Sequence, residues 1–203
     1  MQHYFIDKEH SKEDFFEFTE NILGHNLVFK SCDSIFSKDC VDYGTKVLIN
    51  AINENVSLYG DVLDIGCGYG AIGIALSRLF SDVKIDMCDI NNTAVELSKY
   101  NLMSNHAKNV QNVFYSNAYE NVNKIDYDFI VSNPPIKAGK ENLKNILGGA
   151  YEHLKKGGNL IFVIKKKHGE DSIKKYLSTI FESVEVIKRD SGYYILRAVK
   201  WEW

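Results

Sequence analysis

The feature that most limits the fold is a regular alternation that begins at Asp61, where short apolar runs typical of strands are followed by amphipathic stretches typical of helices. Such an alternation predicts a parallel sheet with helices on both faces. The expected strands are 61–66, 83–89, 112–116, 127–133, 159–166, 184–190 and 193–200, and the expected helices are 71–80, 92–105, 141–156 and 170–181. The last two strands meet at Ser191 and Gly192, which leaves no room for a crossover helix. We therefore expect an α/β sandwich of seven strands, six parallel and the last reversed.

The first forty residues are rich in aromatic side chains and precede the alternating region. Stretches at 15–22 and 26–31, separated by Leu-Gly-His, predict a β-hairpin. A helical pattern follows at 45–56. A chain of 203 residues is long enough for one well-buried domain and short for two. We expect a single domain, with a hairpin extension at 1–40 and the core at 41–203.

The composition is that of an ordinary globular protein and argues against several classes. No apolar run approaches the roughly 18 residues expected of a membrane span, and the charged N-terminal stretch lacks the build of a signal peptide. The four cysteines form no CxxC pair, so neither a metal site nor a disulfide framework is expected. These features favour the cytoplasm. The net charge of -3 does not by itself indicate a nucleic-acid binder, although basic residues can cluster locally.

The unusual segments of the sequence all follow expected strands. They read DIGCGYG, CDI, SNAYE, SNPPI and KKKHG in chain order. In open parallel sheets, ligands bind outside the carboxyl ends of the strands. We therefore expect these segments to meet at one edge of the sheet and to form the site.

The glycine loop after the first core strand contains Gly68, Gly70 and Gly73 in the spacing of the dinucleotide fingerprint. Asp64, near the end of the same strand, argues against that interpretation, because a carboxylate beside the loop would repel a pyrophosphate. The same charge suits a ligand that carries an ammonium or sulfonium group. A carboxylate in an apolar strand is costly unless something pairs with it, so we interpret Asp64 as a ligand-facing acid rather than a satisfied structural one.

Two further polar side chains follow the next two strands. The Asp89 carboxylate could accept hydrogen bonds from both hydroxyls of a ribose, or it could cap the following helix. Since Asn91 and Asn92 could already provide that cap, the ribose role is favoured. Asn117 could bind an adenine edge or serve as a turn residue, and the sequence leaves these two roles open.

Taken together, VLDIGCGYG and CDI resemble the S-adenosylmethionine (AdoMet) site of class I, Rossmann-like methyltransferases. The resemblance implies that Asp64 faces the methionine amino group, that Asp89 holds the ribose and that the glycines let the backbone approach the ligand. Many members carry Asp where this chain has Asn117. The residues implied to contact the cofactor are Asp64, Gly66, Gly68, Gly70, Asp89, Asn117 and Ala118.

The chain has only two prolines, and both follow Asn133 at the end of an expected strand. In methyltransferases that act on planar amino groups, an Asn-Pro-Pro-aromatic motif occupies this position, which implies that Asn133 and Pro134 bind the target amine. Such an amine is a poor nucleophile because its lone pair is delocalised. The Asn side-chain oxygen and a fixed Pro carbonyl can hold its two N–H groups and aim the lone pair at the methyl group of a sulfonium.

The segments NPPIKAGK, FSKDCVDYGT and KKKHG resemble the RsmC-type family of small-subunit rRNA guanine-N(2) methyltransferases and their short single-domain relatives. This sequence corresponds to the catalytic half of the double-length members. The resemblance implies RNA as the partner, either small-subunit rRNA or the ribosomal subunit. Ile136 replaces the aromatic residue of the motif, so it can pack on a base but cannot stack on it.

Further contacts follow from this resemblance. The residues implied to lie near the methionine end of the cofactor are Ser37, Asp42, Gly44 and Thr45. Asp42 and Thr45 are equally typical of a helix start. The residues implied to contact the substrate are Pro135, Ile136, Lys137, Lys140, Lys165, Lys166 and Lys167. The lysines among them could hold RNA phosphates, or they could be solvated surface charge.

Other functions stay open at this stage. Release-factor methyltransferases carry the same Asn-Pro-Pro motif and act on a glutamine amide, although Ile136 and the lysines favour RNA. A non-catalytic AdoMet-binding or RNA-binding module is a further alternative, which the intact Asp64, Asp89 and Asn133 disfavour. A nicotinamide-dependent dehydrogenase is the weakest, because of the charge at Asp64.

Overall fold

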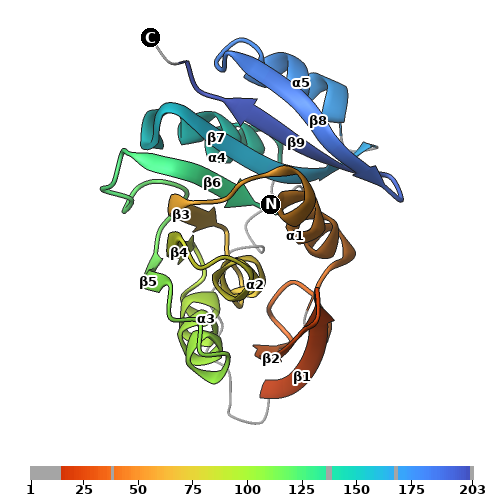
Figure 1. Cartoon of the computed structure of the whole chain (residues 1–203), viewed down its shortest axis with the longest axis vertical. Helices are drawn as coiled ribbons and strands as arrows, with labels where there is room; N and C mark the ends of the chain where they lie inside the picture. The colour runs from red at the N-terminus through yellow and green to blue at the C-terminus, as the bar shows by residue number, and fades with distance from the viewer. Residues whose placement is uncertain (1–14, 38, 136–138, 167–168, 202–203) are drawn as a thin grey trace.

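The computed structural model describes residues 15–37, 39–135, 139–166 and 169–201, without the side chain of Lys140. Its centre is a seven-stranded sheet with the strand order β5-β4-β3-β6-β7-β9-β8 (Figure 1). The strands of this sheet are β3 Gly60–Ile65, β4 Val83–Asp89, β5 Val110–Tyr115, β6 Tyr127–Ser132, β7 Leu154–Lys165, β8 Ser183–Asp190 and β9 Tyr193–Val199, and a separate hairpin consists of β1 Phe15–Ile22 and β2 His25–Cys32. β9 runs antiparallel to both β7 and β8, and the other neighbouring pairs are parallel. The expected six parallel strands and one reversed strand are confirmed.

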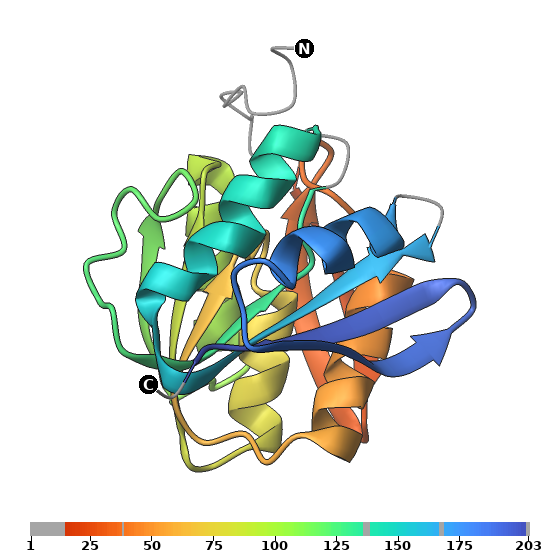
Figure 2. The ribbon, with the colours of Figure 1, turned by 90° about the horizontal axis from the view of Figure 1, so that it is seen from above.

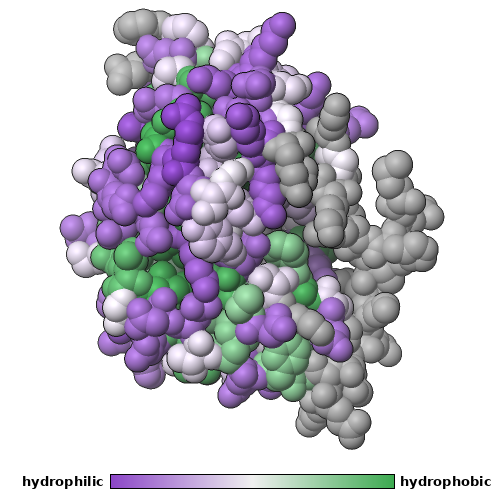
Figure 3. Space-filling view, turned by 90° about the vertical axis from the view of Figure 1, so that its right-hand side faces the viewer, coloured by the Kyte–Doolittle hydropathy of each residue, from purple (hydrophilic) through white to green (hydrophobic). Residues whose placement is uncertain are grey.

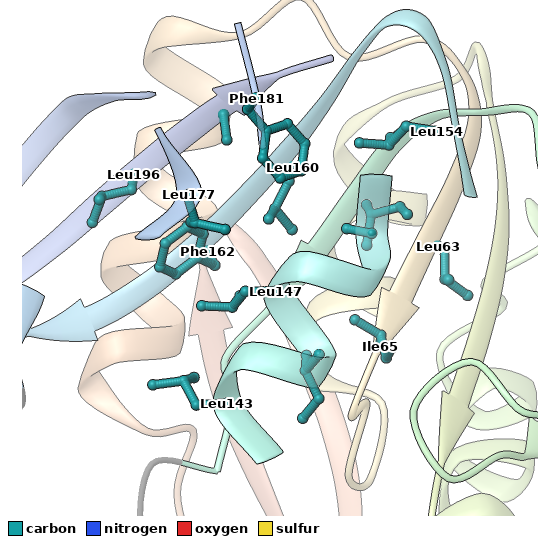
Figure 4. Close-up of a cluster of buried hydrophobic side chains, with 14 of the residues drawn as sticks. Leu63, Ile65, Leu143, Leu147, Leu154, Leu160, Phe162, Leu177, Phe181 and Leu196 are labelled. Carbon is teal, nitrogen blue, oxygen red and sulfur yellow. The ribbon is translucent and has the colours of Figure 1, made fainter. Parts of the chain in front are cut away.

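Helices cover both faces of the sheet, as the alternation predicted (Figure 2). The helices are α1 Tyr43–Asn55, α2 Ala71–Leu79, α3 Asn92–Ser104, α4 Lys140–His153 and α5 Glu170–Leu177. α4 and α5 pack on one face, in a cluster that includes Leu63, Leu147 and Phe162 (Figure 4). α1 and α2 pack on the other face, in a cluster that includes Leu48 and Val131. Within the described part of the chain, no helix is both long enough and apolar enough to cross a membrane.

The N-terminal hairpin is confirmed, and its strand β2 is fixed to α3 by two asparagine side chains one helical turn apart. Asn101 bonds both the N–H and the carbonyl of Lys30, and Asn105 does the same for Val28. Residues two apart on a strand lie on the same face, and so do residues four apart on a helix. Asn101 and Asn105 on one face of α3 can therefore bond to Lys30 and Val28 of β2 at the same time. Figure 3 faces the right-hand side of the view in Figure 1. On that face, apolar surface gathers in the lower half, which is the half that holds the hairpin in Figure 1.

The boundary between α4 and β7 differs from the expectation. The pattern at 141–156 predicts one continuous helix, but α4 ends before Leu154, which begins β7. Leu154 pairs with Tyr127 of β6, and the Lys155 ammonium forms an ion pair with Asp128 at 2.9 Å. Pairing with a strand that is distant in sequence therefore overrides the local helical pattern.

The order in which the chain adds strands to the sheet reverses between β3 and β6. β3, β4 and β5 follow one another towards one edge, whereas β6 and β7 lie on the other side of β3. Ligands of open α/β sheets bind at such a switch point, outside the carboxyl ends of the strands. Because the glycine loop follows β3 and Asn133 follows β6, the fold brings these two segments side by side.

Candidate active site

A cavity of about 500 Å³ lies at the switch point. The predicted site residues in its wall are Ser37, Asp42, Thr45, Gly66, Gly68, Asp89, Asn117, Ala118, Asn133, Pro134, Pro135 and Lys165. Of the other predicted residues, Gly44, Asp64, Gly70 and Lys166 are not part of the wall, and Ile136, Lys137, Lys167 and the side chain of Lys140 lie outside what the structure describes. The structure thus brings together most of the predicted residues that it describes.

The glycine loop between β3 and α2 is held by β4 and α3. The N–H groups of Gly66 and Cys67 both donate to the carbonyl of Cys88 near the end of β4. From α3, the Ser98 hydroxyl donates to the carbonyl of Gly68 at 2.8 Å. These bonds fix the path of the loop through contacts within the protein itself.

Gly66 and Gly68 leave the loop backbone open to a ligand. Their φ angles of +74° and +58° lie in the left-handed region, which glycine adopts at no steric cost. A Cβ built on either residue would meet no atom within 4 Å, and both residues line the cavity. This geometry fits the predicted close approach of AdoMet to the loop.

Asp89 ends β4 and lies in the cavity wall beside the loop. Its two carboxylate oxygens accept the backbone N–H groups of Gly68 and Asn91, at 2.8 and 2.9 Å. The helix cap that the sequence left open belongs to Asn91, whose side-chain oxygen accepts from Thr93 and Ala94. The backbone bonds therefore fix the orientation of the Asp89 carboxylate in the cavity wall, and its contact with a ribose stays a prediction.

Asp64 is fully buried behind the loop. Its Oδ2 accepts the N–H of Gly73 at 2.9 Å, while Oδ1 has no hydrogen-bond partner in the described part of the chain. Burial raises the pKa of Asp64 to about 7, the Gly73 bond opposes this rise, and the charge of Asp89 adds to it. The Asp64 carboxylate lies behind the residues that line the cavity and is not itself part of the wall. A direct contact with the methionine amino group therefore stays a prediction.

Two thiols lie beside the loop. Burial raises the pKa of both Cys67 and Cys88, and the charges of Asp64 and Asp89 raise it further, so both thiols are neutral. Among the described residues, no group of three His, Cys, Asp or Glu side chains is placed to hold a metal ion. The polar groups that the wall offers are carboxylates, amides, hydroxyls, an ammonium group, the neutral Cys67 thiol and backbone atoms.

The segment after β5 forms another part of the wall. Ala118 has a left-handed backbone with φ +45°, and its carbonyl accepts the Ser116 hydroxyl at 2.7 Å. The Asn117 amide donates to Glu120 at 2.8 Å. Asn117 therefore serves the turn and also lines the cavity, so the turn role and the adenine contact are compatible.

Asn133 follows β6, and its side-chain amide is held by the start of α1. The amide nitrogen Nδ2 donates to Asp42 Oδ2 at 3.2 Å and to Thr45 Oγ1 at 2.9 Å. Because an ionised Asp42 only accepts hydrogen bonds, the group that faces it must be the NH₂. Among the described residues none donates to the amide oxygen Oδ1, and Asn133 lines the cavity beside Pro134. The amide thus presents an acceptor to a ligand.

The segment before α1 has two roles. Asp42 caps the helix, since its Oδ2 also accepts the Thr45 N–H at 3.3 Å. The sequence left a helix start and a place in the site as alternative roles for Asp42 and Thr45. In the structure both residues lie at the start of α1 and also line the cavity. Further back, Ser37 has a φ of +57° and donates its hydroxyl to the Cys40 carbonyl at 2.7 Å, which fixes the turn that carries this segment past the cavity.

Sequence reasoning missed Tyr193, the first residue of β9, which lines the cavity. Tyr193 pairs in register with Lys165, and the Lys165 Nζ lies 4.6 Å from the centre of its ring. The same ring packs over Gly44, where a Cβ would come within 2.7 Å of it. No local signal marks Tyr193, because only the pairing of β9 with β7 brings it to the site.

Comparison with known proteins places this geometry in a family context. Residues 26–197 match the family described as the methyltransferase small domain. The uncharacterized protein YbxB of Bacillus subtilis is 38% identical over 200 residues, which is 98% of each chain. Ribosomal RNA small subunit methyltransferase C of Buchnera aphidicola (subsp. Baizongia pistaciae) is 31% identical over 92% of this chain and 56% of its own length. The chain spans about half the length of the ribosomal RNA methyltransferases that it matches.

Solved structures share the fold. The T. thermophilus 16S rRNA N2 methyltransferase RsmC, in complex with AdoMet and guanosine, has a TM-score of 0.78 at 24% identity, over 92% of this chain and 50% of that chain. A methyltransferase from Pyrococcus furiosus has a TM-score of 0.62 at 23% identity, over 77% of this chain and 83% of that chain. The expected Rossmann-like fold is confirmed.

Proposed function

The chain belongs to the methyltransferase small domain family, and we propose that it methylates the 2-amino group of a guanine in small-subunit ribosomal RNA. It is a methyltransferase of the RsmC type, and its cofactor is AdoMet. One observation supports the finer statement about an exocyclic amine. The Asn133 amide is held from behind by Asp42 and Thr45, so its oxygen is the atom that can meet an N–H group in the cavity.

This orientation matters because an exocyclic amine reacts only when it is well positioned. Its lone pair is delocalised into the ring, so both N–H groups have to be held while the nitrogen faces the methyl donor. Asn133 Oδ1 accepts one N–H, and the neighbouring Pro134 carbonyl accepts the other. Pro135 restricts the backbone of the residue before it, which fixes that carbonyl. Bound AdoMet supplies a methyl group on a sulfonium.

The start of α1 acts as the positioning element of this site. A flipped Asn133 amide would turn its oxygen towards the Asp42 carboxylate, and two acceptors would then face each other. It would also turn NH₂ towards the incoming amine, whose N–H groups it cannot accept. Asp42 and Thr45 therefore keep the only productive orientation of the amide.

The cofactor is proposed to lie over the glycine loop. Gly66 and Gly68 would contact it through their backbone, Asp89 would hold the ribose, and Asn117 and Ala118 would border the adenine. The methionine end would lie towards Ser37 and the start of α1, in the field of the buried Asp64. This placement leaves the Asn133 side of the cavity for the acceptor.

RNA is proposed to lie across the lysine clusters at this edge of the sheet. Lys166 is exposed just after β7, and Lys137, Lys140 and Lys167 belong to the same two clusters in the sequence. If lysines hold phosphates, affinity for RNA should fall steeply as salt is added. A flat salt dependence would contradict this placement. An rRNA substrate also agrees with the cytoplasmic location expected from the sequence.

The test is methyl transfer from radiolabelled AdoMet to total RNA and to total protein from cells that lack this enzyme, followed by digestion of the RNA to nucleosides. The expected result is label in 2-methylguanosine of small-subunit rRNA. Label in protein would contradict the RNA substrate and move the acceptor to an amide such as glutamine, which Asn133 and Pro134 would hold equally well. Label in neither fraction would contradict both acceptors. The matched control is Asn133→Ala, which should bind AdoMet and transfer almost no label.

A further inference from the structure

Lys165 differs from the other lysines of its cluster because it lies inside the cavity wall. It ends β7 and pairs directly with Tyr193 of β9. Both residues line the cavity that contains Asn133, whereas the next residue, Lys166, is exposed and is not part of the wall. Of the two lysines, only Lys165 can therefore reach a group held inside the cavity beside Asn133.

The strand register places Lys165 and Asn133 on the same side of the sheet. Ser132 of β6 pairs with Phe162 of β7, so Asn133 lies level with Val163, and Lys165 is two residues further along. Side chains two residues apart on a strand share a face. Val163 packs in the cluster beneath α1, and Asn133 bonds to the start of α1. Lys165 therefore projects over the same helix start.

Local contacts hold the Lys165 ammonium in this place. Its Nζ lies 4.6 Å from the centre of the Tyr193 ring. The pKa of Lys165 is raised by hydrogen bonding with Tyr193, against partial burial, and also by the charge of Asp42. Asp42 also holds the Asn133 amide, and Lys165 and Asn133 both line the same cavity.

We propose that Lys165 binds the 6-oxygen of the target purine and thereby makes the site specific for guanine. This inference rests on the proposed function, in which Asn133 binds the 2-amino group. In guanine the 2-amino donor and the 6-oxygen acceptor lie on one edge of the base, on either side of N1. Asn133 offers the acceptor for the first, and Lys165 offers the donor for the second, a pairing that lysine commonly makes with guanine. Adenine has an amine at position 6, which an ammonium group cannot pair with.

The test compares guanosine with 2-aminopurine riboside, which keeps the 2-amino group and lacks the 6-oxygen. Their affinities are measured by calorimetry on the full chain loaded with S-adenosylhomocysteine. The wild type should prefer guanosine, and Lys165→Met should reduce that preference roughly 10-fold, as expected when a specific lysine–guanine contact is lost. Lys165→Arg, which keeps a charged donor, should retain most of the preference. The matched control is Lys166→Met, which should leave the preference unchanged.

The outcomes separate this inference from the proposed function. An unchanged preference in Lys165→Met, while the wild type still prefers guanosine, would overturn the role of Lys165 and leave the guanine assignment intact. Weaker binding of S-adenosylhomocysteine to Lys165→Met would assign the lysine to the cofactor carboxylate and would also overturn it. A wild type that binds guanosine no better than adenosine would overturn the guanine assignment, and this inference with it. The S-adenosylhomocysteine titration also shows that each variant is folded.

Discussion

The glycine loop after β3 and the Asn-Pro-Pro segment after β6 lie side by side at one sheet edge, but the protein fixes them in different ways. The loop is held by elements that follow it in the same half of the sheet, through Cys88 and Asp89 of β4 and Ser98 of α3. The Asn-Pro-Pro segment is held from α1, through Asp42 and Thr45, which are 91 and 88 residues from Asn133 along the chain.

This difference separates the binding of the cofactor from the positioning of the acceptor. The loop offers backbone to its ligand, and its backbone is held mainly by β4 and α3, while the Tyr69 side chain also reaches the Cys40 carbonyl before α1. The Asn133 amide depends on two side chains from another element, neither of which bonds to the loop in the described structure. Substitutions should therefore divide into those that weaken AdoMet binding and those that slow turnover at unchanged AdoMet affinity.

The largest effect is expected from the carboxylate beneath the loop. The pKa of Asp64 is raised from 3.8 to about 7 in the folded protein. The folded state therefore holds a proton that the unfolded state releases, and stability from this group is complete below about pH 4 and lost as the pH rises towards 7. Three units correspond to about 4 kcal/mol in the free energy of unfolding.

The measurement is urea unfolding of the ligand-free wild type and of Asp64→Asn across this pH range. Asparagine keeps an acceptor for the Gly73 N–H and cannot ionise, so the wild type should lose stability relative to the variant as the pH rises. A stability difference that stays constant with pH would mean that Asp64 is ionised throughout. Binding of AdoMet, a cation at its sulfonium, should lower the pKa of Asp64 and release protons near neutral pH.

A smaller effect is expected at Asp89, on the cofactor side. Asp89→Ala should weaken AdoMet binding by about 1.5–3 kcal/mol, the range for hydrogen bonds to a charged group. Calorimetry with S-adenosylhomocysteine and its 2′-deoxy analogue distinguishes two roles of Asp89. One is the proposed contact with the ribose hydroxyls, and the other is the hydrogen bond that Asp89 accepts from the Gly68 N–H of the loop. The wild type should distinguish the two ligands, and the variant should not. An equal distinction in both proteins would leave Asp89 with only its role in the loop.

The smallest effect is expected on the acceptor side, at Thr45. Thr45→Val keeps the shape of the side chain and removes the acceptor for the Asn133 amide, which should cost about 1 kcal/mol and slow turnover roughly fivefold. AdoMet affinity should fall less than turnover, because the Thr45 hydroxyl bonds to Asn133 while the loop and Asp89 supply most of the proposed cofactor contacts. Thr45→Ser, which keeps the hydroxyl, is the matched control and should turn over like the wild type. A loss of AdoMet affinity in Thr45→Val as large as the loss of turnover would contradict the separation of the two sides.

The fold could be predicted where short-range pattern decides it. The alternation of apolar and amphipathic runs gave the layers, and the short turn at Ser191 and Gly192 gave the reversed last strand. The insertion of β9 between β7 and β8 could not be predicted, because it depends on pairing between strands. The same limit explains the incorrect helix end at Leu154, where pairing with Tyr127 outweighs the helical pattern.

The site follows the same division. Gly66, Gly68 and Asp89 could be found because loop and acid follow consecutive strands in a spacing that the sequence displays. The bond from Asn133 to Asp42 and the place of Tyr193 beside Lys165 could not, since they join segments that meet only in the folded chain. The residues on the cofactor side can thus be recognised from local sequence, whereas the arrangement on the acceptor side depends on tertiary packing.

The most direct measurement takes AdoMet affinity and turnover on small-subunit rRNA from the same preparation of Asn133→Ala. If Asn133 positions the acceptor and has no part in holding the cofactor, AdoMet affinity is unchanged and turnover falls ~100-fold or more, as when a pre-organised polar group is removed. Turnover within a few-fold of the wild type, or a loss of AdoMet affinity that matches the loss of turnover, would contradict that role.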